Sequence, residues 1–301
     1  MIKYSFIIPC FNSENTIKIC LDSIFAQNKF LNQLEVLIVD DGSHDSTKNI
    51  IHTYDHYDNV KIISHPQNKG LAAARNLGIK SADGEILVFI DSDMELSKNW
   101  LDVLDNIFDN DNIMGVMGQY CFPKNIVPNR LDKYLYSSMR GAKKNYKSGD
   151  CIEFKYFLFS NTAIKKNALH DIGVFDETFK KYGGEDTDLA IRLFEKHGNQ
   201  FLYFNNLITY HHGQKSLGSF FKNMRDYGEN NLPRLIKKYP EHKKHFGGHW
   251  LDSIFSLLLF NKLFVLIINF IVKKFPIKIC IRYLIIYNTI MGYRMRNKKN
   301  N

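Results

Sequence analysis

The sequence predicts an α/β fold, with a mostly parallel sheet covered by helices on both faces and a helical region after it. Over the first 90 residues, short β-branched apolar runs alternate with longer amphipathic segments. This β-α-β order implies a parallel sheet with right-handed crossovers. The chain has 301 residues, of which 45% are hydrophobic, so it can bury the large core that such a sheet requires.

The first half is expected to contain four strands joined by three helices. Each strand candidate is a short apolar run rich in β-branched or aromatic side chains. The strands are predicted at residues 4–8, 35–39, 60–64 and 85–90. Each helix candidate begins at or after polar or glycine residues that favour a helix start. The helices are predicted at residues 16–27, 46–57 and 71–81.

Polar residues follow three of these strands where they end, at 9–12, 40–43 and 91–93. Because the carboxyl ends of parallel strands meet at one edge of a sheet, these residues converge on a crevice of the kind that binds ligands. Asp91 and Asp93 are buried carboxylates that need a compensating charge, and Mg²⁺ or Mn²⁺ bound to a diphosphate would supply it. The alternative is an ordinary turn before a helix near Lys98. The convergence of three strand ends favours the ligand site.

Five segments resemble, in order and spacing, the motifs of family 2 glycosyltransferases of the GT-A fold, a Rossmann-like αβα sandwich. The segments, all within residues 4–213, are FIIPCFNSENTI, VLIVDDGSHDST, NKGLAAARNLGI, ILVFIDSDME and YGGEDTDLAIRL. The resemblance implies an inverting transfer of a sugar from a nucleotide diphosphate sugar, usually UDP-linked. It also implies assistance by Mn²⁺ or Mg²⁺.

The resemblance implies roles for residues on the nucleotide side. Pro9 and Phe11 would flank the base, and Asp41 would accept a hydrogen bond from the imide N–H of the base. Gly70 and Arg75 stand near the start of a predicted helix, where they are suited to phosphate or to sugar hydroxyls. The alternative for Arg75 is a solvated helix face on which it pairs with a nearby acid.

The diphosphate and its metal are assigned to the residues after the fourth strand. By the resemblance, Asp91 and Ser92 would contact the nucleotide sugar, with Asp91 near the ribose, and Asp93 would ligate the metal. A histidine that follows the last strand of the domain would complete the metal site. His211 is the candidate, and His212 stays open because adjacent residues of an extended segment point to opposite sides.

The acidic pair Glu185-Asp186 is the candidate for catalysis. An inverting transfer needs one base to deprotonate the acceptor hydroxyl. By the resemblance, Asp186 is that base and Glu185 binds acceptor hydroxyls. Both precede a predicted helix at residues 187–196, whose N-terminal dipole stabilises carboxylates. The alternative is a helix-capping cluster without chemistry.

The expected domain organisation has two parts. Residues 1–215 form the catalytic domain, with a nucleotide-sugar half at about 1–115 and an acceptor half at about 116–215. The acceptor half begins with a segment to residue 150 that lacks a regular pattern. This segment either shapes the acceptor side of the site or is a surface connection without a role in binding. A strand at 154–163, a helix at 164–172 and a strand at 201–204 follow. Residues 216–301 form a helical region, with a tail at about 253–301.

The net charge of +9 lies entirely in this tail. No acidic residue follows Asp252, whereas nine of the 40 basic residues do, so the rest of the chain is neutral. The basic residues interrupt apolar runs at 254–272 and 277–291, which predicts amphipathic helices on a membrane surface. Lys262 in the first run opposes a clean span of the bilayer. The alternative is a helical pair packed on the catalytic domain or on a second subunit.

The sequence therefore predicts a peripheral or monotopic glycosyltransferase at the cytoplasmic face of the membrane, with a glycan or lipid-linked acceptor. Nucleic acid is excluded as a partner, because the basic excess lies in a tail and not on a folded domain. The five cysteines are odd in number and lack a CxxC pair, which fits a reducing compartment. One alternative is a sugar nucleotidyltransferase, although PCFNSEN replaces the glycine-rich phosphate loop expected of it. Another is a non-catalytic, membrane-attached partner that binds nucleotide sugars.

Overall fold

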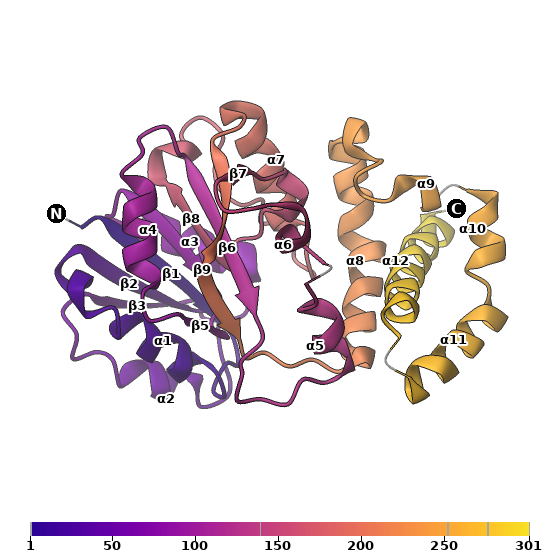
Figure 1. Ribbon diagram of the computed structural model, residues 1–301, viewed down its shortest axis with the longest axis horizontal. Coiled ribbons are helices and arrows are strands. Elements are labelled where there is room, and N and C mark those ends of the chain that lie inside the picture. The colour runs from indigo at the N-terminus through magenta and orange to yellow at the C-terminus, as the bar shows by residue number, and fades with distance from the viewer. Residues whose placement is uncertain (1, 139, 252, 276, 301) are drawn as a thin grey trace. The chain divides into compact units, whose positions relative to one another are not determined.

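The structure is a computed structural model that describes residues 2–138, 140–251, 253–275 and 277–300. The chain forms two compact units (Figure 1). The first unit comprises Met1–Val127, Ser138–Lys180 and Glu185–Gly213. The second comprises Pro128–Ser137, Lys181–Gly184 and Gln214–Asn301. The short segment before Glu185 therefore belongs to the second unit, while Glu185 itself belongs to the first.

The first unit is built on a nine-stranded sheet with the order β3-β2-β1-β4-β8-β6-β9-β5, and β7 pairs with β9. Its strands are β1 (Tyr4–Cys10), β2 (Leu34–Asp40), β3 (Val60–Ser64), β4 (Ile86–Ile90), β5 (Met94–Leu96), β6 (Gly115–Cys121), β7 (Asp150–Cys151), β8 (Asn161–Lys165) and β9 (Phe201–His211). Its helices are α1 (Ile17–Phe25), α2 (Thr47–His52), α3 (Leu71–Ser81), α4 (Trp100–Phe108), α6 (Ala142–Asn145) and α7 (Glu185–His197).

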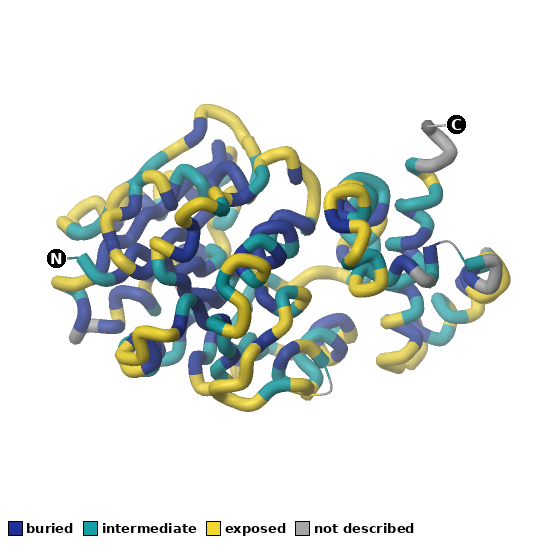
Figure 2. The backbone as a smooth tube through the Cα atoms, turned by 90° about the horizontal axis from the view of Figure 1, so that it is seen from above, coloured by how far each residue is buried: buried dark blue, intermediate teal, exposed yellow. Residues whose placement is uncertain are grey.

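Alternating side chains of the central strands fill the two sides of this sheet. Phe6 packs on one side with Trp100 of α4 and with residues of α1. Ile7 and Phe89 pack on the other side with residues of α3 and α7. Since successive side chains of a strand point to opposite faces, continuous apolar runs such as β1 and β4 are buried on both sides (Figure 2). This two-sided burial explains why the runs lack polar alternation.

The predicted first half is confirmed. β1 pairs in parallel with β2 and β4, and β2 pairs in parallel with β3. The three predicted helices are present as α1, α2 and α3. However, α2 is shorter than expected because it ends at His52 and turns follow it.

The prediction for the second half needs correction. Residues 115–150 do contain a regular element, because β6 lies in the sheet between β8 and β9. The strand predicted at 154–163 begins only at Asn161, after a 3₁₀ turn at Phe154–Tyr156. No helix forms at 164–172, where the structure has the end of β8 and a short 3₁₀ turn, Lys166–Leu169. Because β8 pairs antiparallel with both β4 and β6, the sheet is mixed beyond β4 and not mostly parallel.

The strand predicted at 201–204 is longer than expected. β9 runs from Phe201 to His211, and its register against β6 shifts between Gly118 and Gln119. That irregularity lets one strand pair with β6, β7 and β5 along its length. As a result, His211 ends a strand and does not lie in the loop after it.

The second unit is helical. It contains α5 (Arg130–Leu135), α8 (Leu217–Lys238), α9 (Gly248–Leu251), α10 (Ile254–Leu259), α11 (Lys262–Lys274) and α12 (Lys278–Asn300). Helices α8 and α12 cross closely, because a Cβ on Gly228 would overlap the Thr289 carbonyl oxygen. Asn231 of α8 donates hydrogen bonds to the carbonyl oxygens of Lys181, at 3.0 Å, and Gly183, at 2.5 Å. Helix α8 thereby anchors the segment that leads into the acidic pair.

The predicted apolar run 254–272 divides into two helices. The first ends at Leu259. Asn261 caps the second, since its Oδ1 accepts from the Phe264 N–H at 3.0 Å. In the part of the chain that the structure describes, no helix combines the length and apolar character that crossing a membrane requires. Asp252 and the side chain of Lys262, on which part of the tail prediction depends, lie outside the described residues.

Candidate active site

Asp41 stands directly after β2 and is buried among hydrogen-bond donors. Its Oδ1 accepts from Nδ1 of His65 at 2.7 Å and from the Lys69 N–H at 3.0 Å. Its Oδ2 accepts from the Gly70 N–H at 2.8 Å. The two donors fill the lone pairs of Oδ1, whereas Oδ2 keeps one acceptor position. That position is where an N–H of a nucleotide base would bind if Asp41 has its predicted role.

Two glycines shape the same edge of the sheet. Gly42 has a φ of +77° and Gly70 a φ of +99°, a region that favours glycine. A Cβ on Gly42 would also stand 2.8 Å from the backbone carbon of Gln67. Gly70 was predicted to contact the donor, and its N–H is already used by Asp41. Both glycines are therefore required by the turns that form the site.

The loops after β1 and β2 are held together by reciprocal hydrogen bonds. The Asn12 N–H donates to Oγ of Ser43 at 2.9 Å, and the His44 N–H donates to Oδ1 of Asn12 at 2.9 Å. Phe11 is 41% exposed, and its ring meets that of His44 edge-on. Pro9 is buried in β1, beyond the point where β1 stops pairing with β4. Phe11 is therefore accessible to a base, whereas Pro9 is buried in the strand.

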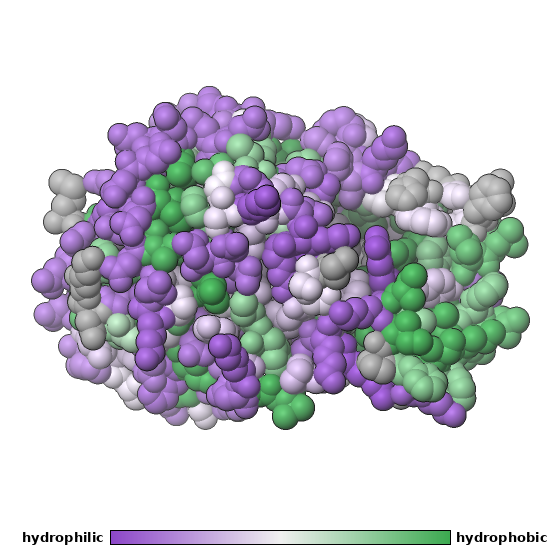
Figure 3. Space-filling view, viewed as in Figure 1, coloured by the Kyte–Doolittle hydropathy of each residue, from purple (hydrophilic) through white to green (hydrophobic). Residues whose placement is uncertain are grey.

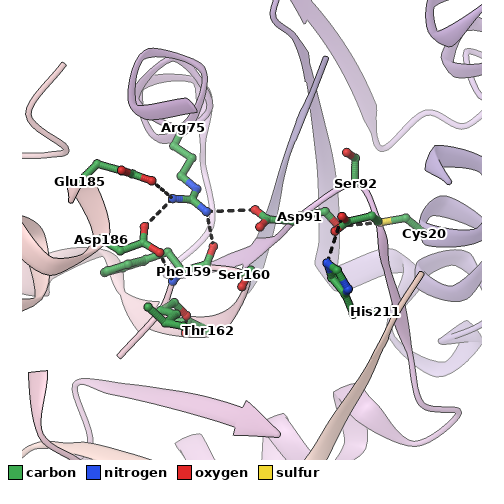
Figure 4. Close-up of polar contacts among 12 residues, drawn as sticks. Cys20, Arg75, Asp91, Ser92, Phe159, Ser160, Thr162, Glu185, Asp186 and His211 are labelled. Atoms are coloured by element: carbon green, nitrogen blue, oxygen red, sulfur yellow. Dashed lines mark hydrogen bonds and ion pairs between the residues drawn. The ribbon is translucent and has the colours of Figure 1, made fainter. Parts of the chain in front are cut away.

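Arg75 of α3 links the carboxylates of two distant segments (Figure 4). Its Nη1 donates to Oδ1 of Asp186 at 2.6 Å, and its Nη2 donates to Oδ1 of Asp91 at 3.0 Å and to the Phe159 carbonyl at 2.9 Å. The Arg75 side chain is only 1% exposed, so it does not lie on a solvated helix face. It pairs with acids, and its contact with the donor stays a prediction.

Glu185 and Asp186 begin α7, which starts two residues before the predicted helix, and both belong to this buried group. Oδ2 of Asp186 accepts from the Phe159 N–H at 3.2 Å. Oε1 of Glu185 lies 3.9 Å from Nη1 of Arg75, and its Oε2 has no hydrogen-bond partner among the described residues. Burial and the neighbouring Asp186 raise the pKa of Glu185 to about 8. One guanidinium thus faces three carboxyl groups, and a proton on Glu185 reduces the buried negative charge.

The free energy of unfolding of the ligand-free protein is expected to fall between about pH 5 and 8, and Glu185→Gln is expected to remove much of this fall. Glu185 ionises near 4.5 when unfolded but near 8 when folded, beside Asp186, Asp91 and Arg75. The folded state therefore binds more protons in this window, and stability drops by up to about 1.4 kcal/mol per pH unit. Urea unfolding of both proteins across the window measures the effect. Parallel pH profiles would contradict it.

Asp93 and His211 meet where β5 pairs antiparallel with β9. Met94 lies opposite His211 in this pairing, so Asp93 is brought beside the end of β9. Oδ2 of Asp93 and Nε2 of His211 are 3.1 Å apart. His212 turns to the other side, and its Nε2 lies 2.6 Å from Oε2 of Glu95. The geometry therefore favours His211 over His212 as the partner of Asp93.

This pair fits a divalent cation. A carboxylate oxygen and an imidazole nitrogen at this separation can share one ion, and Mn²⁺ accepts both donor types. The side chains of Asp93 and His211 are 26% and 18% exposed. Ions of this class often use few protein ligands and keep positions for water and phosphate oxygens. Asp93 and His211 would hold such an ion, and a diphosphate would complete its coordination.

Gly213→Ala is expected to weaken metal-dependent binding of UDP roughly tenfold, with little loss of stability. A Cβ on Gly213 would overlap Oδ2 of Asp93 and would stand 3.1 Å from both Cγ of Asp93 and Cε1 of His211, so the Asp93 carboxylate has to shift away from its present position. Titration calorimetry with Mn²⁺ and UDP measures the affinity. Gly218→Ala is the matched control, since its Cβ would meet only Oγ of Ser216, at 3.9 Å. An unchanged affinity in the Gly213 variant would rule out this account of the site.

Some residues of the site were missed from the sequence. Phe159 binds both Arg75 and Asp186 through its backbone, and a backbone contact leaves no signal in residue type. Oγ of Ser13 lies 2.9 Å from Oγ of Ser92, which joins the loop before α1 to the predicted diphosphate segment. A serine in a turn is too common to be singled out. Both omissions concern segments far apart in the chain.

A sheet whose parallel half ends in polar loops is typical of nucleotide-binding enzymes. The sequence model of glycosyl transferase family 2 matches residues 5–173, which is more than half of the chain. A second model, described as the N-terminal domain of galactosyltransferase, matches residues 151–214. The chain therefore belongs to glycosyl transferase family 2. Membership of this family argues against the nucleotidyltransferase alternative.

Curated relatives include two synthases from Pasteurella multocida. Chondroitin synthase (strain Pm70) is 27% identical over 266 residues, which cover 79% of this chain and 27% of that protein. Hyaluronan synthase is 27% identical over 267 residues, which cover 78% of this chain and 27% of that protein. The chain thus spans about a quarter of the length of these relatives.

Solved structures with the same fold include two that contain nucleotide sugars. The mannosyltransferase PcManGT from Pyrobaculum calidifontis, in complex with GDP-Man and Mn²⁺, has a TM-score of 0.68 and 18% identity, over 99% of this chain and 88% of that chain. S. aureus TarS 1–349, in complex with UDP-GlcNAc, has a TM-score of 0.58 and 18% identity, over 99% and 91%. At this identity the likeness establishes the GT-A fold alone.

Proposed function

We propose that this glycosyltransferase moves a sugar from a UDP-sugar to a hydroxyl group of a glycan or lipid-linked acceptor, with inversion at the anomeric carbon. Asp186 is the base, and Asp93 with His211 holds Mn²⁺ or Mg²⁺. The observation that carries the proposal is the position of Arg75, whose two terminal nitrogens bind Asp186 and Asp91. One buried guanidinium therefore fixes the distance between the proposed base, Asp186, and Asp91, which is predicted to contact the nucleotide sugar.

The reaction is a single displacement. The acceptor oxygen bonds to the anomeric carbon while its proton passes to the carboxylate of Asp186, and the bond from the anomeric carbon to the diphosphate oxygen breaks. The products are the glycosylated acceptor, UDP and a proton on Asp186, which solvent then removes. Arg75 and the Phe159 N–H hold the carboxylate in one orientation, and such preorganisation lowers the cost of reaching the reactive geometry.

Glu185 is proposed to bind the acceptor. Its Oε2 lacks a hydrogen-bond partner among the described residues, and an orphaned buried oxygen is costly unless a ligand satisfies it. With its raised pKa, Glu185 carries a proton near neutral pH and can donate to an acceptor oxygen as well as accept. Glu185 would thus contact the acceptor next to Asp186, the proposed base.

The donor is proposed to be UDP-linked. The remaining acceptor position on Asp41 suits an imide N–H such as that of uracil, and the exposed ring of Phe11 can stack on a base. The TarS structure holds UDP-GlcNAc, which supports a UDP-sugar as the donor. PcManGT holds GDP-Man, so GDP is the nucleotide with which the binding of UDP should be compared. A divalent ion at Asp93 and His211 would stabilise the charge that develops on the leaving diphosphate.

Thermal unfolding with UDP, GDP and their sugars, with and without Mn²⁺, tests the donor. A ligand that binds only the folded state raises the unfolding midpoint, by a few degrees at about a hundred times its dissociation constant. We expect a Mn²⁺-dependent shift with UDP that exceeds the shift with GDP. The absence of a shift with any nucleotide would overturn the donor site. The anomeric coupling constant of the product, measured by NMR, reports inversion or retention.

A further inference from the structure

Helix α11 is rich in apolar side chains, but only part of its apolar surface is covered by protein. Val265 and Val272 are buried in a cluster of the second unit that includes residues of α5, α8 and α12. On the other side, Leu263, Leu266 and Phe270 are 67%, 68% and 59% exposed. Their spacing of three and four residues places them on one face of the helix. Apolar side chains of a helix are normally packed against another element, whereas this face is exposed in the part of the chain that the structure describes.

The exposed face continues onto neighbouring helices. Of the nineteen large hydrophobic side chains that are exposed in the described residues, eleven lie between Leu257 and Ile279. Figure 3 shows an apolar region over α10 and α11. Contiguous apolar surface of this kind marks an interaction site. We call this region the apolar face.

Basic side chains border the apolar face, and the nearby sequence offers no acid to neutralise them. Lys274, Lys278 and Arg282 are exposed at the end of α11 and the start of α12. The ammonium of Lys274 lies 4.5 Å from the centre of the Phe270 ring, so charge and apolar surface adjoin. No Asp or Glu follows Asp252 in the sequence. The surface thus combines apolar side chains with basic side chains whose own stretch of sequence carries no acid.

We propose that the apolar face is a docking surface for an anionic lipid bilayer. Helix α11 lies in the membrane plane, with Leu263, Leu266 and Phe270 in the acyl region and the basic border at the phosphate groups. Its 13 residues span about 20 Å, short of the roughly 30 Å hydrocarbon core. An interfacial position therefore suits it, and the combination of an apolar and a basic surface is what an anionic interface binds.

The charge pattern favours lipid over a second copy of the chain. A two-fold contact through the apolar face would bring identical surfaces together. Lys274, Lys278 and Arg282 would then stand near their own copies without acidic partners, which is unfavourable. Lipid phosphates neutralise the same charges. The inference does not depend on the proposed reaction, because a protein can dock on lipid whether or not it uses UDP-sugars.

Vesicle flotation of the full chain tests the proposal. We expect the protein to float with phosphatidylcholine vesicles that contain phosphatidylglycerol. The variant Leu263→Ser/Leu266→Ser/Phe270→Ser should bind roughly tenfold more weakly, because three exposed apolar side chains no longer enter the bilayer. The variant Lys274→Ala/Lys278→Ala/Arg282→Ala should lose the part of binding that depends on phosphatidylglycerol and on low salt. Val127→Ser/Val174→Ser, at exposed positions elsewhere, should float like the parent protein.

Two outcomes would overturn the proposal. One is a parent protein that stays unbound to phosphatidylcholine vesicles whether or not they contain phosphatidylglycerol. This includes the case in which sedimentation shows a dimer that the triple serine variant dissociates. The other is a triple serine variant that floats as well as the parent. Thermal unfolding of each variant verifies that it is folded. The UDP-dependent shift of the unfolding midpoint, measured on the same variants, separates failure of docking from failure of the donor site.

Discussion

Asp186→Asn is expected to lower the rate of sugar transfer by roughly a thousandfold while leaving the affinity for UDP and Mn²⁺ nearly unchanged. An amide cannot take the proton of the acceptor hydroxyl, so the loss falls on kcat. The amide can also satisfy only one of the two donors that Asp186 binds, Arg75 and the Phe159 N–H. We therefore expect a stability loss of about 1–3 kcal/mol, and rates should be compared well below both unfolding midpoints.

Asp171→Asn is the matched control for this variant. Asp171 is exposed, pairs with His170 and Lys196, and has a φ of 68°, a conformation that asparagine also tolerates. It lies outside the candidate site, and the same chemical change there should leave transfer intact. If Asp186→Asn retains the parent rate with its fold preserved, Asp186 is not the base.

His211→Ala is expected to lower kcat/KM by roughly a hundredfold and to abolish most of the Mn²⁺-dependent binding of UDP. The change removes the nitrogen that lies 3.1 Å from Oδ2 of Asp93, so one of the two proposed protein ligands is lost. Binding of UDP without metal should be affected much less, because the base pocket around Asp41 is untouched. Titration calorimetry with and without Mn²⁺ separates the two contributions.

His212→Ala is the control for His211→Ala, since the two residues are adjacent and chemically identical. The His212 side chain contacts Glu95, so its removal should reduce stability by about 1 kcal/mol and leave the metal dependence unchanged. The opposite pattern, with His212 controlling the metal dependence and His211 without effect, would show that the assigned ligand is wrong. Equal effects of both would point to a general disturbance of β9.

The first half of the chain could be predicted well because its signals are local. The apolar runs that became β1, β2 and β4 are short and β-branched, and α1 and α3 begin after residues that favour helix starts. Local patterns also located the polar strand ends at Asp41 and Asp93. Parallel pairing then follows from the alternation of strands and helices. No contact between distant residues is needed for this inference.

The second half was predicted poorly because its strands depend on distant partners. β6 lies in a segment without periodicity, and it becomes a strand through pairing with β8 and β9. Asn161, which begins β8, is buried, and its Oδ1 accepts a hydrogen bond from Nε1 of Trp100. Its polar residue type alone would have predicted an exposed position. In such strands, context outweighs intrinsic preference.

By itself, the sequence determined the α/β class, the family and the residues that carry charge at the edge of the sheet. The tertiary structure decided how these charges are paired. It turned His211 and not His212 toward Asp93, buried Arg75 between Asp91 and Asp186, and left α11 with one covered and one exposed apolar face. The physical reason is that periodicity and composition act over a few residues. The compensation of a buried charge and the covering of a helix face depend on segments that only the folded chain brings together.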